Sequence, residues 1–166
     1  MPPYRLQALL DIRTKAEDDA KEAFSQAVKA AEKEKKQLVT LQQTLERMKV
    51  ERKAKVQAFL EEMTARGGGI NGFQQMGRFE ARLKDEEAQQ ALEVERQKEA
   101  VVQADKLVEQ RREEMAEAAK EKKAIEKNKE AFLKQVRTER MAKEELNQEE
   151  IGNTLHLQRM RAEKNK

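Results

Sequence analysis

A glycine-rich stretch separates two long segments that contain almost no other glycine or proline. Four of the six glycines fall within residues 67–72, where the sequence reads GGGING. Glycine adopts left-handed backbone angles at little cost, so a run of three glycines ends a helix and reverses the chain. Asn71 can cap a second helix, with Gln74 at the capping-box position. The stretch therefore predicts the tip of an antiparallel helical hairpin.

The composition favours long helices over a compact core. Of the 166 residues, 40% are charged and only 4% are aromatic, which is typical of coiled coils. Disorder is the competing interpretation of such low hydropathy, but a sustained apolar spacing argues against it. The net charge is only +3 and both signs alternate along the chain. This pattern indicates solvated helix faces rather than a nucleic-acid-binding stripe.

Both segments carry an apolar stripe with coiled-coil spacing. In the first, the apolar residues step by fours and threes, at Ala20, Phe24, Ala27, Ala31, Leu38, Leu41, Leu45 and Met48. In the second, they recur every seven residues, at Val94, Val101, Val108 and Met115. These are the a and d positions of a left-handed coiled coil. Glu34 interrupts the first stripe and predicts a weak layer.

Folding the chain at the glycines brings the two stripes into one register, in which facing residue numbers sum to 139. Leu45 then faces Val94, and Leu38 faces Val101. The same rule pairs opposite charges, Arg52 with Glu87 and Glu17 with Lys122, and it places two further pairs side by side, Phe59 with Phe79 and Leu6 with Phe132. The agreement predicts an all-α fold: a long two-helix antiparallel coiled-coil hairpin with an overhanging C-terminal helix.

We expect a single coiled-coil unit with four parts. The first helix covers residues 4–65, the tip loop 66–72 and the second helix 73–150, while a short helix with a basic tail follows at 151–166. A break within residues 149–154 separates the last two parts. At 1.5 Å per residue the paired arms would extend about 90 Å.

No pattern of residues indicates catalysis, a cofactor or a metal. His156 is the only histidine, and there is no cysteine. The glycine run lacks the Lys-Ser/Thr that follows a phosphate-binding loop. Most carboxylates have lysines or arginines at helical spacing, as solvated ion pairs do. We therefore expect a protein that is not an enzyme, with no cofactor and no nucleic-acid partner. No apolar run approaches the length of a membrane span or a signal peptide, which predicts a cytoplasmic protein without membrane insertion.

Most of the large apolar side chains near the glycines allow two interpretations: a plug for the hairpin end, or a partner-binding head. Three of them are expected to face the opposite arm: Phe59, Met63 and Phe73. Three others cannot all fit into a two-helix seam, which leaves one flank exposed beside Glu80 and Glu87: Met76, Phe79 and Leu83. Met and Phe are enriched in the cores of protein interfaces.

Three short motifs resemble the FliJ/YscO (SctO) family of type III secretion. They are YRLQALLDIR at residues 4–13, FQQM at 73–76 and KEELNQEEIG at 143–152. The resemblance spans the whole chain and is closer to the injectisome branch than to the flagellar one. A flagellar export stalk remains the alternative within the family.

The resemblance implies a stalk similar to the γ subunit of rotary ATPases. Family members contact a hexameric export ATPase with the part that bears both termini, and the cytoplasmic ring of the export gate with the tip. Some also bind export chaperones. The implied gate contact follows the FQQM motif, at Met76, Phe79, Glu80 and Leu83, although Glu80 and Glu87 depart from the family pattern.

We expect the ATPase ring to contact the end of the hairpin where the two termini lie. The apolar residues would enter the bore of the ring and the arginines would meet acidic loops, with the contact formed by Arg5, Leu6, Leu9, Arg13, Val136 and Arg140. The localisation that follows is cytoplasmic and peripheral to the inner-membrane export apparatus. Two other classes stay open: a coiled-coil spacer or chaperone-like module that binds clients at the tip, and an arm that binds RNA.

Overall fold

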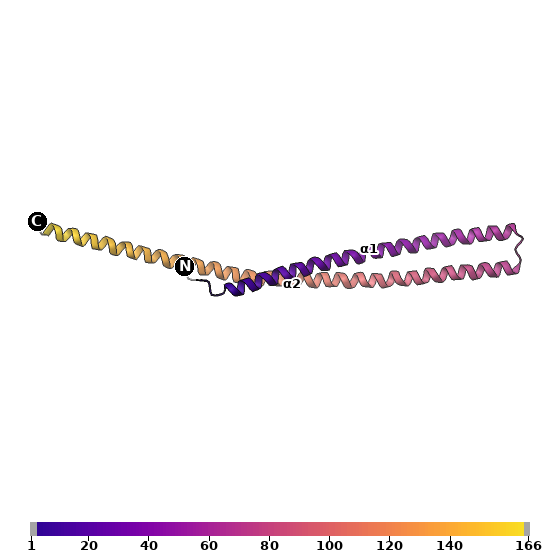
Figure 1. The fold of residues 1–166 in the computed structure, drawn as a ribbon, viewed down its shortest axis with the longest axis horizontal. Coiled ribbons are helices and arrows are strands. Elements are labelled where there is room, and N and C mark those ends of the chain that lie inside the picture. The colour runs from indigo at the N-terminus through magenta and orange to yellow at the C-terminus, as the bar shows by residue number, and fades with distance from the viewer. Residues whose placement is uncertain (1–2, 165–166) are drawn as a thin grey trace. The chain divides into compact units, whose positions relative to one another are not determined.

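The computed structural model describes residues 3–164, and over this range it contains two α-helices and no strand. Helix α1 spans Gln7–Ala65 and helix α2 spans Ile70–Lys164. Figure 1 shows the two helices joined by a short connection at one end of the hairpin. The predicted all-α hairpin with an overhanging C-terminal helix is confirmed. Residues 165 and 166, the end of the predicted basic tail, lie outside the described range.

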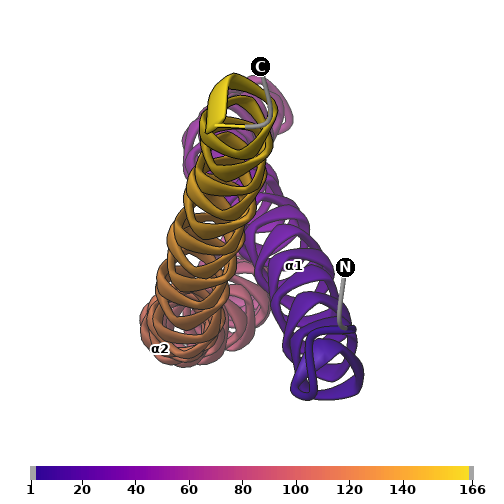
Figure 2. The ribbon, with the colours of Figure 1, turned by 90° about the vertical axis from the view of Figure 1, so that its left-hand side faces the viewer.

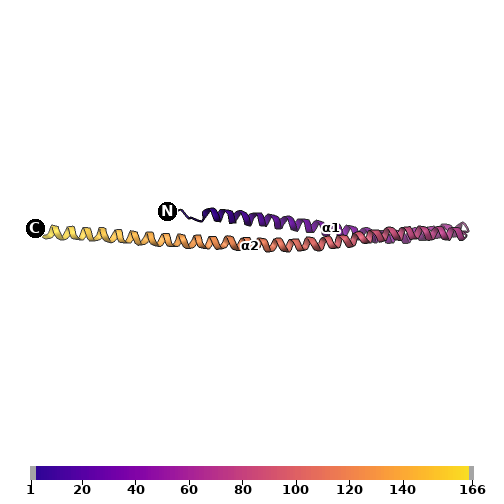
Figure 3. The same cartoon turned by 90° about the horizontal axis from the view of Figure 1, so that it is seen from below.

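The chain divides into two compact units, each built from one segment of α1 and one antiparallel segment of α2. Unit 2 comprises Lys21–Glu114 and includes the glycine turn, whereas unit 1 combines the chain up to Ala20 with the chain from Met115 onward. Within unit 1, α2 continues well past the beginning of α1 (Figures 1 and 3). Sequence analysis expected a single unit.

The seam of unit 2 follows the predicted register. Ala31 and Val94 are buried, with 4% and 5% of their surface exposed, and Leu38 and Val101 are half-buried. Small side chains such as alanine allow two helices to approach closely, but a two-helix seam leaves both flanks open to water. Accordingly, no large side chain of the described residues is fully buried. The predicted pairing of Arg52 with Glu87 is present, with Nε donating to Oε1 at 2.7 Å.

Unit 1 contains the second predicted ion pair, between Lys122 and Glu17 at 2.9 Å. Sequence analysis placed Leu6 beside Phe132; in the structure the ring of Tyr4 packs against Phe132, and Leu6 is 40% exposed. The Tyr4 and Phe132 ring centroids are 5.4 Å apart. The physical reason is that α1 begins only at Gln7. Tyr4 therefore lies in a turn outside the helix, from which its ring reaches α2.

The turn is tighter than predicted. Gly67 adopts a φ of 68°, the left-handed conformation that ends a helix, and the Gly68 N–H donates to the Met63 carbonyl at 2.9 Å. Helix α2 then begins at Ile70, three residues before the predicted start at residue 73. The Gly72 N–H donates to the Gly69 carbonyl at 2.9 Å. The predicted capping role of Asn71 is therefore wrong, because Asn71 lies inside the first turn of α2.

The predicted break within residues 149–154 is also wrong, because α2 is helical through to Lys164. One glycine in a helix costs only about 1 kcal/mol relative to alanine, and helix-forming residues flank Gly152. Thr154 donates its hydroxyl to the Glu150 carbonyl at 2.7 Å, so this polar side chain is satisfied within the helix. Figure 2 views these last turns of α2 nearly along the helix.

Candidate interaction surfaces at the base and the tip

The base, defined as residues 4–17 with residues 121–140, is held together by side chains from both helices. Tyr4 donates its hydroxyl to Asn128 Oδ1 at 2.8 Å. Lys129 Nζ donates to Gln7 Oε1, also at 2.8 Å. These contacts fix the N-terminal turn against α2. Sequence analysis missed the Tyr4 contact, although a lone tyrosine near Phe132 in the register was a usable signal.

The ion pair of Lys122 and Glu17 is the most enclosed of the base. Its side chains are 24% and 11% exposed. The hydrogen bond to Glu17 raises the pKa of Lys122 above its ordinary value, with further contributions from the Glu17, Glu126 and Asp18 charges. Lys122 is therefore charged at neutral pH, and its contact with Glu17 agrees with the predicted register in this part of the seam.

The residues predicted to contact an ATPase ring fall into two groups. Three are exposed: Arg5, Leu6 and Arg140. Three are half-buried: Leu9, Arg13 and Val136. Arg13 forms an ion pair with Glu121, and Arg140 donates to Glu144 at 2.8 Å. The exposed members lie beside a much larger exposed surface in the C-terminal part of α2.

That surface is the overhang, which we define as residues 137–163, and every residue in it is exposed. Six of its side chains are large and apolar, with 45% to 62% of their surface exposed: Met141, Leu146, Ile151, Leu155, Leu157 and Met160. So many large apolar side chains without a covering neighbour make this segment a candidate interaction surface. Sequence analysis expected an overhanging C-terminal helix but assigned ring-contact residues only at its start, at Val136 and Arg140.

The tip, defined as residues 53–86, packs mainly through aromatic and methionine side chains. The rings of Phe59 and Phe79 stack with centroids 5.7 Å apart, as the register predicted. The Arg82 guanidinium lies over the Phe79 ring at 5.6 Å from its centroid. Met63 lies directly under Gly72, where an added Cβ would be 2.8 Å from the methionine sulfur. The apolar tip residues therefore largely hold the hairpin end together.

One prediction for the tip is wrong: Phe73 does not face the opposite arm and is 59% exposed. Because α2 begins at Ile70 instead of residue 73, Phe73 is already within the helix, and its side chain lies on the solvent side of the first turn. Ile70 is also exposed, at 79%. The residues of the predicted gate contact, Met76, Phe79, Glu80 and Leu83, are all half-buried.

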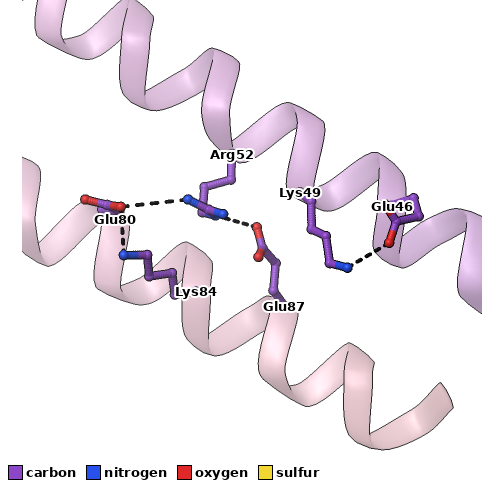
Figure 4. Close-up of polar contacts among 6 residues, drawn as sticks. All are labelled: Glu46, Lys49, Arg52, Glu80, Lys84 and Glu87. Atoms are coloured by element: carbon purple, nitrogen blue, oxygen red, sulfur yellow. Dashed lines mark hydrogen bonds and ion pairs between the residues drawn. The ribbon is translucent and has the colours of Figure 1, made fainter. Parts of the chain in front are cut away.

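Glu80 and Glu87 belong to a charged layer at the boundary of the tip, shown in Figure 4. Arg52 contacts both, at 2.7 Å for Glu87 and 3.8 Å for Glu80. Lys84 approaches Glu80 to 2.8 Å. The hydrogen bond from Lys84 lowers the pKa of Glu80, with a smaller contribution from the Arg52 charge. The two glutamates therefore face the seam rather than an exposed docking flank.

A polar layer also lies further along unit 2. Gln97 is buried and donates to both the backbone carbonyl and the side chain of Glu34. This contact explains how the weak layer predicted at Glu34 is accommodated. Sequence analysis did not identify Gln97, because the register pairs position 34 with position 105 rather than with 97.

The described residues contain no cluster of three or more histidine or acidic side chains that could hold a metal ion. Over the same range, neither helix has a stretch long and apolar enough to cross a membrane.

Comparisons with known proteins agree with this architecture. Among solved structures, the chain is similar to a candidate YscO homolog, CT670 from Chlamydia trachomatis, with a TM-score of 0.77 and 24% identity; the match covers 94% of this chain and 96% of that one. No curated protein sequence matches significantly. A model of the YscO-like protein family matches residues 1–162. Because this match spans almost the whole sequence, the chain belongs to the YscO-like family.

Proposed function

We propose that this chain is a central-stalk component of a type III secretion apparatus, which links a hexameric export ATPase to the cytoplasmic ring of the export gate. The YscO-like family supports the coarser statement, a stalk-like protein of type III secretion. In the finer proposal, the chain has no catalytic activity of its own. It stimulates ATP hydrolysis by contacts inside the ATPase ring and acts in the cytoplasm, at the inner-membrane export apparatus.

The observation that carries the proposal is the overhang. The six large apolar side chains of residues 137–163 have no packing partner among the described residues that buries them. A helix that is exposed on all sides gains nothing from these side chains by itself, since an apolar surface stabilises a protein only when it leaves water. A partner that covers the overhang supplies this burial.

The apolar side chains also surround the helix. At about 100° per residue, Leu146, Leu157 and Met160 form one row. The other three, Met141, Ile151 and Leu155, form a second row on the opposite side. A partner with one flat groove would bury only one of these rows. A ring that encloses the helix buries both, which favours the bore of a hexamer over a single docking surface.

The base extends this contact. Leu6 and Arg5 are exposed at the base, and Arg140 is exposed within the first turn of the overhang, where it adds positive charge. We assign the ATPase-ring contact to Arg5, Leu6, Leu9, Arg13, Val136 and Arg140 together with the overhang. Arg13 acts within its ion pair to Glu121, so its main role is to hold α1 in place.

We assign the export-gate contact to the tip, at Met76, Phe79, Glu80 and Leu83. The apolar character of Met76, Phe79 and Leu83 supports this assignment, since Met, Phe and Leu provide large contact surfaces; Glu80 is included as their partly exposed neighbour, paired with Lys84. We also propose export chaperones as a further class of partner, because the chain belongs to this family.

The test is ATPase stimulation by a variant with one apolar row of the overhang removed, L146S/L157S/M160S. We expect the stimulation and the affinity for the ATPase to fall by about tenfold or more, roughly 1.4 kcal/mol. Helicity should be retained, because these side chains are not packed in the seam. A matched control, V39S/V50S, removes apolar side chains of similar exposure from α1 and should stimulate normally.

Two outcomes would contradict the proposal. If L146S/L157S/M160S stimulates the ATPase as well as the wild-type chain does, the overhang is not the ring contact. If the unaltered chain neither binds nor stimulates the ATPase, and captures client proteins through its tip instead, the chain is a chaperone-like spacer.

A further inference from the structure

The charged layer at Arg52 marks a change in how the two helices of unit 2 pack. Three of its side chains lie in the seam, with exposures of 20% for Arg52, 13% for Glu87 and 31% for Glu80. Figure 4 shows Arg52 of α1 reaching between the two glutamates of α2. One arginine thus serves two carboxylates, and Glu80 is shared with Lys84. Such a layer satisfies its charges but provides little apolar burial.

Packing differs on the two sides of this layer. The buried residues of unit 2 all lie on the side away from the glycine turn: Ala27, Ala31, Val94 and Gln97. On the tip side, none of the residues 53–86 is buried. The seam residues there are half-buried, including Val56, Phe59, Phe79 and Leu83, as are Leu38, Leu45 and Val101 on the other side. What the tip lacks is any buried layer like those at Ala31 and Val94.

The tip is also short enough to behave as a separate cooperative segment. Its arms, residues 53–65 and 70–86, are the last turns of α1 and the first turns of α2, so they can unwind from the glycine turn and re-form on the remaining helices without new nucleation. Once the arms separate, each loses the packing that supports it. Separation and loss of helical hydrogen bonds are therefore coupled within the tip, and the ion pairs of the charged layer limit how far they spread.

We propose that the tip opens as a unit, that the Arg52 layer is where the opening stops, and that this opening controls access to the gate-contact residues. The last part rests on the proposed function of the tip. In the described state, one face of Phe79 stacks on Phe59, and Arg82 also lies over the ring. Opening removes Phe59 from this ring and exposes Phe79 and Leu83 together, as a partner requires.

The first experiment measures amide hydrogen exchange on the free chain and needs no partner. We expect the amides of residues 53–86 to exchange together, at least about tenfold faster than those of residues 31–48 and 91–108. In the variant R52L/E87L, an apolar layer replaces the ion pair, a change that is often stabilising. The exchange of the tip amides should then slow towards that of the rest of unit 2.

The inference is overturned if the tip amides are as protected as those of residues 31–48. It is also overturned if exchange rates increase gradually along both arms without a change at residue 52, because this would be ordinary fraying.

The second experiment links opening to binding. The chain has no cysteine, so V56C/L83C, a facing pair in the confirmed register, introduces a single disulfide across the tip. The oxidised variant should bind the cytoplasmic domain of the export gate about tenfold more weakly than the same protein after reduction. Because Leu83 belongs to the assigned gate contact, L83C alone serves as a second control, and its gate binding should equal that of reduced V56C/L83C under both conditions. The control L45C/V94C places the disulfide on the other side of the Arg52 layer, and oxidation should leave its gate binding unchanged.

The outcomes separate the two proposals. Equal binding by oxidised and reduced V56C/L83C overturns the control of access, whatever the exchange rates show. Absence of gate binding by the unaltered chain overturns the assigned function of the tip, while amide exchange still decides whether the tip opens as a unit.

Discussion

Replacing Val94 with alanine tests both the register of the seam and the size of its contribution. Val94 is 5% exposed, so V94A removes two methyl groups that are almost completely buried. At about 0.8 kcal/mol per buried carbon, the loss is about 1.5 kcal/mol. Because a two-helix seam has solvent on both flanks, the arms can close much of the space and little cavity cost is added. The higher helix propensity of alanine offsets about 0.5 kcal/mol.

The net expectation for V94A is a loss of about 1 kcal/mol, which for a chain of this length lowers the melting temperature by roughly 2–4 °C. The assay is thermal and urea unfolding followed by circular dichroism. The matched control is L92A, two residues earlier on the same helix, where Leu92 is 59% exposed. Although L92A removes more carbon atoms, its effect should stay within about 0.5 kcal/mol. An equal or larger loss in L92A would refute the register, since it would place the other face of α2 in the seam.

Three further predictions concern single positions. G67A should destabilise the hairpin by about 1 kcal/mol in urea unfolding, because φ is 68° there and left-handed angles are costly for other residues; G69A, with open space around it and no positive φ, should have little effect. The pKa of Glu80 lies below its ordinary 4.5, so the stability that its charge contributes is fully present above pH 4.5 and is lost on further acidification. Melting temperatures measured from pH 7 to pH 3 should therefore decline less in E80Q than in the wild-type chain. Y4F should keep the ring contact with Phe132 but lose the hydrogen bond to Asn128, at a cost of about 0.5–1 kcal/mol of stability. If Y4F lost more stability than Y4A, the ring contact would not be stabilising the base.

The hairpin and its register could be predicted because both depend on repeated local signals. Two stripes with the same spacing have very few ways to face each other, and the opposite charges at Arg52 and Glu87 agree with the apolar layers. The Arg52–Glu87 contact at 2.7 Å follows directly from that rule. Glycine has a similarly direct physical meaning, so the position of the turn also followed from the sequence.

The details at the helix ends could not be predicted in the same way. Asn71 is a good capping residue, but the backbone of Gly69 accepts the first hydrogen bonds of α2 instead. A single turn of difference then decided whether Phe73 faces the seam or solvent. Gly152 indicated a break, yet the helix formers around it outweigh its cost. Such outcomes depend on differences of about 1 kcal/mol, which sequence patterns do not resolve.

The candidate surfaces were predicted in type better than in detail. Apolar side chains do gather at the tip, but most serve the hairpin end itself, and the paired glutamates face Arg52. The overhang itself was expected, but the contact residues assigned within it were limited to its start. Exposure along residues 137–163 is a property of the folded chain, since it depends on where α1 begins relative to α2.

The contact between Tyr4 and Phe132 makes the base spectroscopically distinct. The chain has one tyrosine and no tryptophan, so its tyrosine emission originates from a single side chain, whose ring lies tilted against Phe132 and whose hydroxyl donates to Asn128. Emission intensity and anisotropy therefore report on the N-terminal turn alone, without an attached dye. A tryptophan-bearing partner that approaches within energy-transfer range would quench this emission. Arrival of a partner at the base can thus be followed in real time, independently of events at the glycine turn.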